Sequence, residues 1–458
     1  MFKQNQNLPD HKGNSDEPET GREVMSFCIN LLRIAGLTPI YERNPIIAHA
    51  HNFFIFALLM TSTILQIVGL IECWGDFKPM CFISGTLSGC SAITVNYILL
   101  IKNRDAIFKV IHVLKIEYIS RVNPKYMGYV RNSEKEVVKS AILKILFGTA
   151  LTGLGTIIPL INKSIDDGGS VTGNLTKYQY MTKYQIFVTY TPLDIQQSPQ
   201  FELNYVVLVI LTAFVVGTDA VIDSLYYALL SHLTAQFKIL VAVLDDMDEN
   251  LNFIDNEESI NYSKTTSKKC EVKQRYSTDI SKEEMDSIQL NEVSNVYPDG
   301  KDIHKAYLKD CIRRHQALLS FSDDLNSMMS FAAFLQVIST PVMICMGGFL
   351  MTTSLTVFTD VIKYSSLVAL AFYKLLIYCM YAEDLTQASL KVREALYNLN
   401  WYGLSMQCQR MLPIMIIRSA DAVVPKASVF YELSMDSFGT VLNTAYTYFT
   451  LLLQMSDS

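Results

Sequence analysis

The chain has 458 residues, of which 50% are hydrophobic and 18% charged. Soluble proteins carry about 25% charged residues, so this composition predicts an integral membrane protein rather than a soluble enzyme. The net charge of −6 excludes a basic surface for nucleic acid, and the nine cysteines lack the spacing of a metal site or disulfide scaffold. We therefore expect no enzymatic activity, metal or cofactor.

The N-terminal residues 1–22 are polar and are expected to be disordered, because they contain no apolar core of the kind found in a signal peptide. From 23 to 37, apolar residues recur at helical spacing. This pattern predicts an amphipathic helix that either lies at the membrane interface or packs against the protein. Gly36 and Pro39 are expected to end it.

Hydropathy predicts an all-α membrane protein with seven transmembrane helices. Helical extensions are expected after the fourth and sixth spans, to 244 and 401, with a helix over 304–324 before the fifth and a broken stretch over 411–418. We divide the chain into 1–47, 48–246, 247–306, 307–410 and 411–458. The predicted spans are 53–71, 80–101, 141–161, 203–230, 329–357, 361–381 and 437–455.

The distribution of lysine and arginine predicts the orientation of the chain. Residues 102–139 contain nine of them and the equally long 162–200 only three, so the first segment is expected to be cytosolic. Two sequons, at Asn162 and Asn174, fall in the segment thereby placed outside and are candidate glycosylation sites. The N-terminus is then cytosolic and the C-terminus extracellular.

This orientation is the reverse of a G-protein-coupled receptor, and the sequence motifs of that class are absent. Residues 247–306 form a long hydrophilic insertion of mixed charge, which we interpret as a disordered cytosolic loop. A transporter is a third class, but it would need more charged residues inside the spans. Asp219 and Asp223 lie one helical turn apart on span four, where they either form a cation site or pair with Lys or Arg. Asp219 is a functional candidate if it is buried.

Two lysines flank span six. Lys363 is expected to reach the outer membrane boundary, whereas Lys374 is a functional candidate if it is buried.

The C-terminal helix is uncharged over 437–455 but carries hydroxyl and amide side chains. At 3.6 residues per turn, Thr440, Thr444, Thr447, Leu451 and Gln454 or Met455 share one face. Such a face suits a pore-lining helix whose gate is formed by Leu451 and Met455. The alternative is a helix packed within one subunit, with its hydroxyls bonded to its own carbonyls.

Several short stretches, in a fixed order, carry a resemblance to a known family. They cover 31–39, 232–237, 311–316, 378–385, 395–401, 417–420 and 445–453. The chain resembles insect odorant receptors, a family of seven-span ligand-gated cation channels. Thr447, Tyr448 and Gln454 also match the ending of the related gustatory receptors, which remain an alternative. The C-terminal tail resembles a ligand-tuning subunit rather than the co-receptor.

The resemblance implies a heterotetramer with the obligate odorant co-receptor, in the plasma membrane of a sensory neuron dendrite. A volatile, mostly apolar odorant would open a non-selective cation pore lined by the last helix. The family's pore and gate positions map onto Thr447, Leu451, Gln454 and Met455. The cytosolic extensions would form an intersubunit anchor domain, with His315, Gln316, Tyr397 and Trp401 as packing candidates.

The resemblance also places the odorant in the outer half of the membrane among spans two, three, four and six. Small residues on span three could equally serve close helix packing. Projected onto this chain, that depth selects Leu87, Ser88, Ser91, Thr149, Thr152, Gly153, Thr156, Val209, Ile210, Ala213, Ser366, Leu370 and Tyr373.

Overall fold

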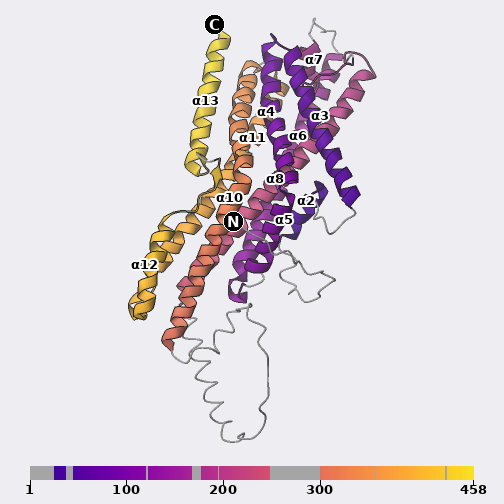
Figure 1. Cartoon of the computed structure of the whole chain (residues 1–458). Coiled ribbons are helices and arrows are strands. Elements are labelled where there is room, and N and C mark those ends of the chain that lie inside the picture. The colour runs from indigo at the N-terminus through magenta and orange to yellow at the C-terminus, as the bar shows by residue number, and fades with distance from the viewer. Residues whose placement is uncertain are drawn as a thin grey trace, which may run out of the picture.

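The computed structural model describes residues 25–37, 45–119, 122–167, 177–193, 195–247, 300–355, 357–428 and 431–457. In this part the chain is an elongated bundle of long helices (Figure 1). The predicted disorder of 1–22 and of 248–299 lies outside the described residues, as do Pro39 and Asn174. Residues 300–306, expected in the insertion, already belong to a helix.

The helices follow the predicted spans closely. The first half of the bundle contains α2 (Ser26–Ile34), α3 (Pro45–Glu72), α4 (Phe77–Lys102), α5 (Arg104–Val113) with a π-helical turn (Leu114–Ile119), a 3-10 turn (Pro124–Tyr126), α6 (Met127–Asp167) and α7 (Lys177–Tyr184). The second half contains α8 (Gln200–Asp245), α10 (Gly300–Thr353), α11 (Phe358–Asn398), a 3-10 turn (Trp401–Gly403), α12 (Met406–Ala420) and α13 (Met435–Asp457).

Four helices are much longer than a membrane core requires. Helices α6, α8, α10 and α11 have 41, 46, 54 and 41 residues. At a rise of 1.5 Å per residue, α10 is about 80 Å long, whereas the hydrocarbon core is about 30 Å thick. The predicted extensions are thus present, and the expected helix before span five is the first part of α10 itself, which continues through Pro341.

Within the described residues, six helices are long and apolar enough to cross a membrane: α3, α4, α6, α8, α10 and α11. Helix α13 has 23 residues but is more polar. It runs beside the upper parts of α10 and α11 and completes the expected set of seven helices (Figure 1). The chain is therefore a multi-pass membrane protein.

The middle of α8 forms the centre of the bundle. Nearly every side chain from Thr218 to Leu240 is buried, including Tyr227 and Phe237. A helix buried on all its faces must be covered on every side, and α8 is surrounded by α6, α10, α11, α4, α3 and α2. Any group that α8 carries into the bundle is consequently shielded from solvent and lipid.

The interruption of the last segment lies later than expected. Residues 411–418 were predicted to be broken, but they belong to the continuous helix α12 despite Pro413. Proline removes one helical hydrogen bond, and the buried face of Cys408, Leu412, Met415 and Ser419, spaced four, three and four apart, keeps the segment helical. The chain leaves the helix only at 421–434.

This connector, 421–434, is held by a two-stranded sheet and by the bundle. Strand β1 (Lys426–Ala427) pairs antiparallel with β2 (Tyr431–Glu432), with Lys426 opposite Glu432. On α10, Asn326 donates to the carbonyl of Val424 at 3.3 Å and accepts from the amide of Lys426 at 3.1 Å. The start of α13 is thereby fixed to α10.

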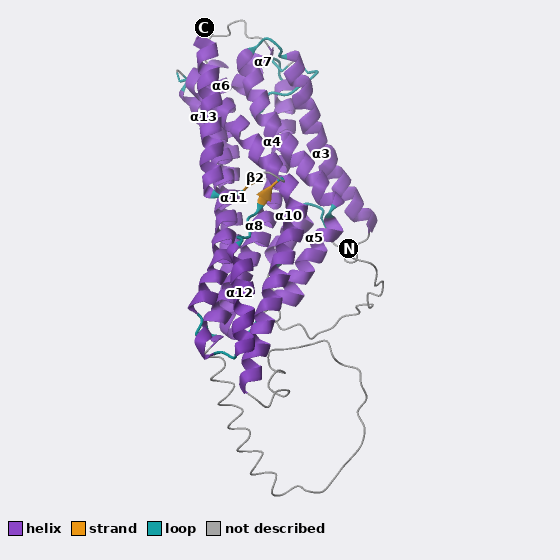
Figure 2. Ribbon diagram, turned by 60° about the vertical axis from the view of Figure 1, so that its left-hand side comes forward, coloured by secondary structure: helices purple, strands orange, loops and turns teal. Residues whose placement is uncertain are grey.

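The two ends of the bundle differ in character. The C-terminus of α13 and helix α7 lie at one end, while α12 lies in the opposite half (Figures 1 and 2). Helix α7 belongs to the lysine-poor segment expected outside, so the predicted extracellular C-terminus agrees with this arrangement. The cytosolic and extracellular sides are assigned from the distribution of lysine and arginine along the sequence.

Candidate ligand cavity and pore helix

A cavity of about 620 Å³ lies among α4, α6, α8, α10 and α11, and residues of α2, of α3 and of the chain after α7 also line it. Its walls are mainly apolar, and several hydroxyls that line it are bonded to carbonyls of their own helices. Thr149 donates to Leu146 O at 3.0 Å and Thr212 to Leu208 O at 2.6 Å. The cavity therefore suits a mostly apolar small molecule in size and lining.

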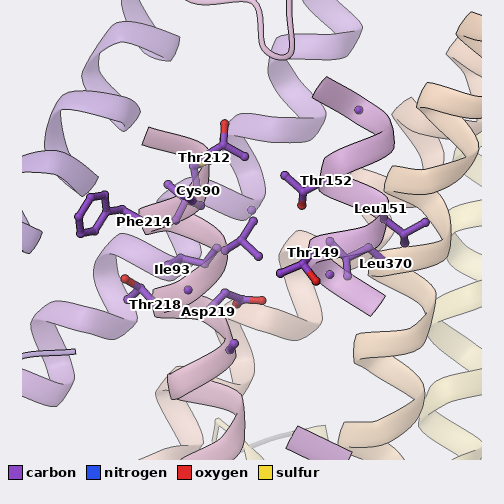
Figure 3. Close-up of a pocket in the computed structure, with 18 of the residues that line it drawn as sticks. Cys90, Ile93, Thr149, Leu151, Thr152, Thr212, Phe214, Thr218, Asp219 and Leu370 are labelled. Carbon is purple, nitrogen blue, oxygen red and sulfur yellow. The ribbon is translucent and has the colours of Figure 1, made fainter. Parts of the chain in front are cut away.

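The cavity brings together most of the residues that we selected by depth. Those that line it are Thr149, Thr152, Gly153, Thr156, Val209, Ala213, Ser366 and Leu370. Figure 3 shows Thr149, Thr152 and Leu370 around the same space as Thr212 and Asp219. Their role in binding stays a prediction.

Five selected residues do not line the cavity. On α4, the residues that line the cavity are Thr86, Gly89, Cys90 and Ile93, which lie at a similar depth to Leu87, Ser88 and Ser91 but on another face of the helix. Ser88 donates to Gly85 O and lies 3.4 Å from Ser339 O on α10. At 100° per residue, depth alone cannot select a face.

The two remaining residues that do not line the cavity are Ile210 and Tyr373. Ile210 is largely exposed on the outer surface of α8. The ring of Tyr373 packs against Phe147, with ring centroids 5.2 Å apart.

One wall of the cavity, formed by α10, includes none of the residues selected by depth. Gln336, Ser339, Thr340 and Met343 line the cavity. The polar ones are Gln336, Ser339 and Thr340. Because Ser339 and Thr340 follow Gln336 by three and four residues, all three lie on one face of a largely apolar helix. That periodicity is the signal in the sequence that could have found this wall.

A buried cluster of four charged side chains closes one end of the cavity, and we call it the charge quartet. Lys144 on α6 contacts Asp219 and Asp223 on α8, with Nζ 3.0 Å from Asp219 Oδ2. Lys374 on α11 pairs with Asp219 and lies 3.5 Å from Asp223 Oδ1. The predicted pairing of the two aspartates is thus present and joins three helices.

The quartet is largely enclosed. Asp223 is fully buried and Lys144 exposes 4% of its side chain, whereas Asp219 and Lys374 retain 12% and 11%. The hydroxyl of Tyr378 donates to Asp223 Oδ1 at 2.7 Å. Three of the four, Lys144, Asp219 and Lys374, line the cavity. Buried charges in a membrane persist only when they are paired, as here.

Lys363 does not reach the membrane boundary as expected. Its side chain is 2% exposed, and Nζ donates to the carbonyls of Thr182 at 2.8 Å and Gln185 at 2.7 Å. These carbonyls come from α7 and the chain just after it, which fold over the end of the bundle. The lysine therefore points inward and lines the cavity.

Helix α13 packs by one face only. Val441 and Ala445 are buried against the bundle, whereas Leu451 is 51% and Met455 65% exposed, on the face that also carries Thr440, Thr444, Thr447 and Gln454. The hydroxyls of Thr440, Thr444 and Thr447 donate to carbonyls four residues earlier, as in the alternative reading. The polar face nevertheless stays uncovered within one subunit.

The remaining predicted positions have mixed environments. Asn162 lies inside α6 and is 7% exposed, an environment that does not suit a glycan acceptor. Of the anchor candidates, His315 is buried and packs edge-on against Phe237, with ring centroids 6.3 Å apart. Gln316, Tyr397 and Trp401 are exposed on this single chain.

Comparison with protein families identifies the chain. The family model described as 7tm odorant receptor matches residues 76–446. The chain belongs to the odorant receptor family. This match decides against the gustatory alternative.

Curated relatives of this odorant receptor include odorant receptor Or2 of Anopheles gambiae, 27% identical over 147 residues, and odorant receptor 85b of Drosophila melanogaster, 28% identical over 149 residues. The matched stretches span 32% of this chain and 39% and 38% of those relatives. They thus cover well under half of each relative.

Solved structures confirm the fold of the odorant receptor. The insect olfactory receptor OR5 from Machilis hrabei in complex with eugenol matches with a TM-score of 0.72, covering 94% of this chain and 97% of that one. The same receptor in a second structure gives a TM-score of 0.68. The identities of 14% and 13% make this a likeness of fold.

Proposed function

We propose that this odorant receptor is a subunit of a ligand-gated, non-selective cation channel that acts with an obligate co-receptor. A volatile, mostly apolar odorant binds in the cavity and opens a pore lined by α13. The site of action is the plasma membrane of a sensory neuron dendrite. The family membership and the likeness in fold to an olfactory receptor whose structure was solved in complex with eugenol support this proposal.

The observation that best supports a pore is the exposed polar face of α13. Threonine and amide side chains turned toward lipid are unfavourable, so such a face is expected to meet water or another protein. If several subunits met around an axis, this face of α13 would contact both water and the neighbouring subunits. Leu451 and Met455, the large apolar residues of this face near its end, would then form the narrow, water-repelling part of the pore.

The cavity supports the binding step. Burying an apolar ligand stabilises the complex by about 25 cal/mol per Å² of apolar surface removed from water. The cavity lies among α4, α8, α10 and α11, and both α10 and α11 also pack against α13. A ligand that changes the spacing of these two helices is therefore expected to act on α13.

The experiment is whole-cell recording from cells that express the chain with or without the odorant co-receptor, during application of a panel of volatiles. We expect odorant-evoked, non-selective cation current only when both subunits are present. Current from the chain alone would contradict the need for a co-receptor. No current in either case, with both subunits confirmed at the cell surface, would contradict the channel.

A further inference from the structure

The charge quartet divides the cavity into an apolar body and a polar end. Figure 3 shows Asp219 on α8 reaching across the cavity toward Thr149 on α6. Away from this end, the walls are formed by side chains such as Ile93, Leu370 and Phe214. A ligand that fills the cavity and matches both parts must carry one polar group at one end of an apolar body.

The hydrogen-bonding capacity of the quartet is not exhausted. Lys144 uses its donors on Asp219 and Asp223. Among the described residues, the ion pairs of Lys374 are with these same two carboxylates, and its ammonium has three N–H groups. Each oxygen of Asp219 accepts from one lysine, although a carboxylate offers about four acceptor positions. By this count, Lys374 keeps an N–H and Asp219 an acceptor position for a ligand in the cavity that both residues line.

The charge of the quartet limits what can bind there. Two lysines balance two aspartates, and within the described residues no other charged side chain lies within ion-pair distance of them. An ionised ligand group would add an uncompensated charge in a buried environment, where such a charge is costly. A neutral group adds none.

We propose that Asp219 and Lys374 form a subsite for the hydroxyl of a neutral alcohol with an apolar body. The hydroxyl donates to the Asp219 carboxylate and accepts from the Lys374 ammonium, so it uses both free positions. A carbonyl or ether can only accept, and an alkane can do neither. The inference rests on the proposed function, since it names the ligand class of the same cavity.

Lys363 offers the competing possibility of an acid ligand. It also lines the cavity, but two of its three N–H groups are already engaged by the carbonyls of Thr182 and Gln185. Asp360, three residues earlier on the same helix, brings a negative charge close to it. A carboxylate at this position would therefore meet repulsion as well as attraction.

The test uses the purified full-length chain and five ligands of similar length: 1-octanol, its isomer methyl heptyl ether, n-nonane, octanoate and octylammonium. Apparent Kd is taken from the ligand-dependent rise of Tm, which requires no channel activity. We expect 1-octanol to bind at least about tenfold more tightly than the ether, because the ether lacks the donor. Each tenfold step corresponds to about 1.4 kcal/mol.

Two variants locate the subsite. The double variant Asp219→Leu with Lys374→Met removes one acceptor and one donor without a net charge change. It should bring octanol and ether to within about twofold while n-nonane still binds, which shows that the cavity is intact. The control removes a matched pair outside the cavity, Lys125→Met with Asp246→Leu, whose atoms are 3.0 Å apart, and should keep the preference for the alcohol.

Three outcomes overturn the proposal: an unchanged octanol preference in the Asp219 and Lys374 double variant, tighter binding of octanoate or octylammonium than of octanol, or no shift of Tm with any ligand. Failure of the channel proposal is distinguishable from all of them. A chain that binds octanol as expected but gives no current with the co-receptor leaves this subsite in place and removes only the channel.

Discussion

At the scale of single residues, the quartet gathers four buried charges at the meeting point of three helices. Lys144 and Lys374 reach two aspartates of α8 from different helices, so each carboxylate has a partner on both sides. Removing one partner of a buried pair costs about 3 to 5 kcal/mol, whereas replacing a whole pair with apolar residues is often neutral.

We therefore expect Lys144→Met to lower the Tm of the purified receptor strongly and to reduce its surface level. Adding Asp223→Leu should recover most of that loss, because no unpaired charge remains. Lys391→Met, which removes an exposed lysine of α11, should change Tm little. A double variant as unstable as the single one would show that the quartet does more than balance charge.

The neighbours Leu451 and Leu452 allow the gate to be tested with one substitution at two positions. Leu451 is 51% exposed on the polar face of α13, whereas Leu452 is half-buried against the bundle. Leu451→Ser should raise the current in the absence of odorant, because a wetted constriction loses its closed barrier. Leu452→Ser should lower the surface level instead. Unchanged leak in Leu451→Ser receptors confirmed at the surface would remove Leu451 from the gate.

At the scale of helices, the contact of α10 with α11 is unusually close at Gly347. A Cβ built on Gly347 would lie 2.7 Å from Val368 Cγ2, and valine cannot move far because its branched side chain is stiff. Gly347→Ala is therefore expected to destabilise the receptor by about 1 to 3 kcal/mol and to lower Tm. Gly153→Ala, with nothing within 4 Å, is the control and should not lower it. Equal Tm values for the two variants would refute this close packing.

The connector between α12 and α13 is the second helix-scale feature. Asn326 contributes two hydrogen bonds to it, each worth about 1 kcal/mol. Asn326→Ala should therefore reduce the maximal odorant-evoked current by about fivefold to thirtyfold at an unchanged half-activating concentration, since the cavity is untouched. Ser327→Ala is the matched control, because that hydroxyl bonds only within α10, to Asp324 O at 2.8 Å. An altered half-activating concentration would place the effect of Asn326 in the cavity instead.

At the scale of the whole molecule, periodicity and hydropathy predicted the helices well, but not which way each helix faces. The six apolar spans and the long extensions followed from residue patterns, because burial in lipid requires long apolar runs. The burial of Lys363 and the rotation of α4 could not be predicted for a common reason. Both depend on distant segments: the carbonyls of α7 and of the chain just after it, and the face of α10. Asp219 and Asp223 were predicted correctly to be paired because unpaired charges are costly in membranes, yet their partners could be named only from the fold.

Three parts of the chain are connected by packing: the cavity, the helices α10 and α11 that form two of its walls, and α13 packed on both. We propose that the exposed face of α13 lines a water-filled pathway in the assembled receptor. A helix covered by lipid or by another subunit would have the same shape in a single chain. Access of a water-soluble reagent to α13 during current flow distinguishes a pore-lining helix from one covered by lipid or by another subunit.

The most direct measurement introduces cysteine at Thr447, on the exposed face of α13, and at Ala445, on its buried face, in receptors expressed with the co-receptor. A water-soluble, positively charged thiol reagent is applied while odorant-evoked current is recorded. We expect the reagent to reduce the current of the Thr447→Cys receptor irreversibly, and faster when odorant is present. The currents of the Ala445→Cys and unsubstituted receptors should be unchanged. Full current after confirmed labelling at Thr447→Cys would contradict a pore lined by α13.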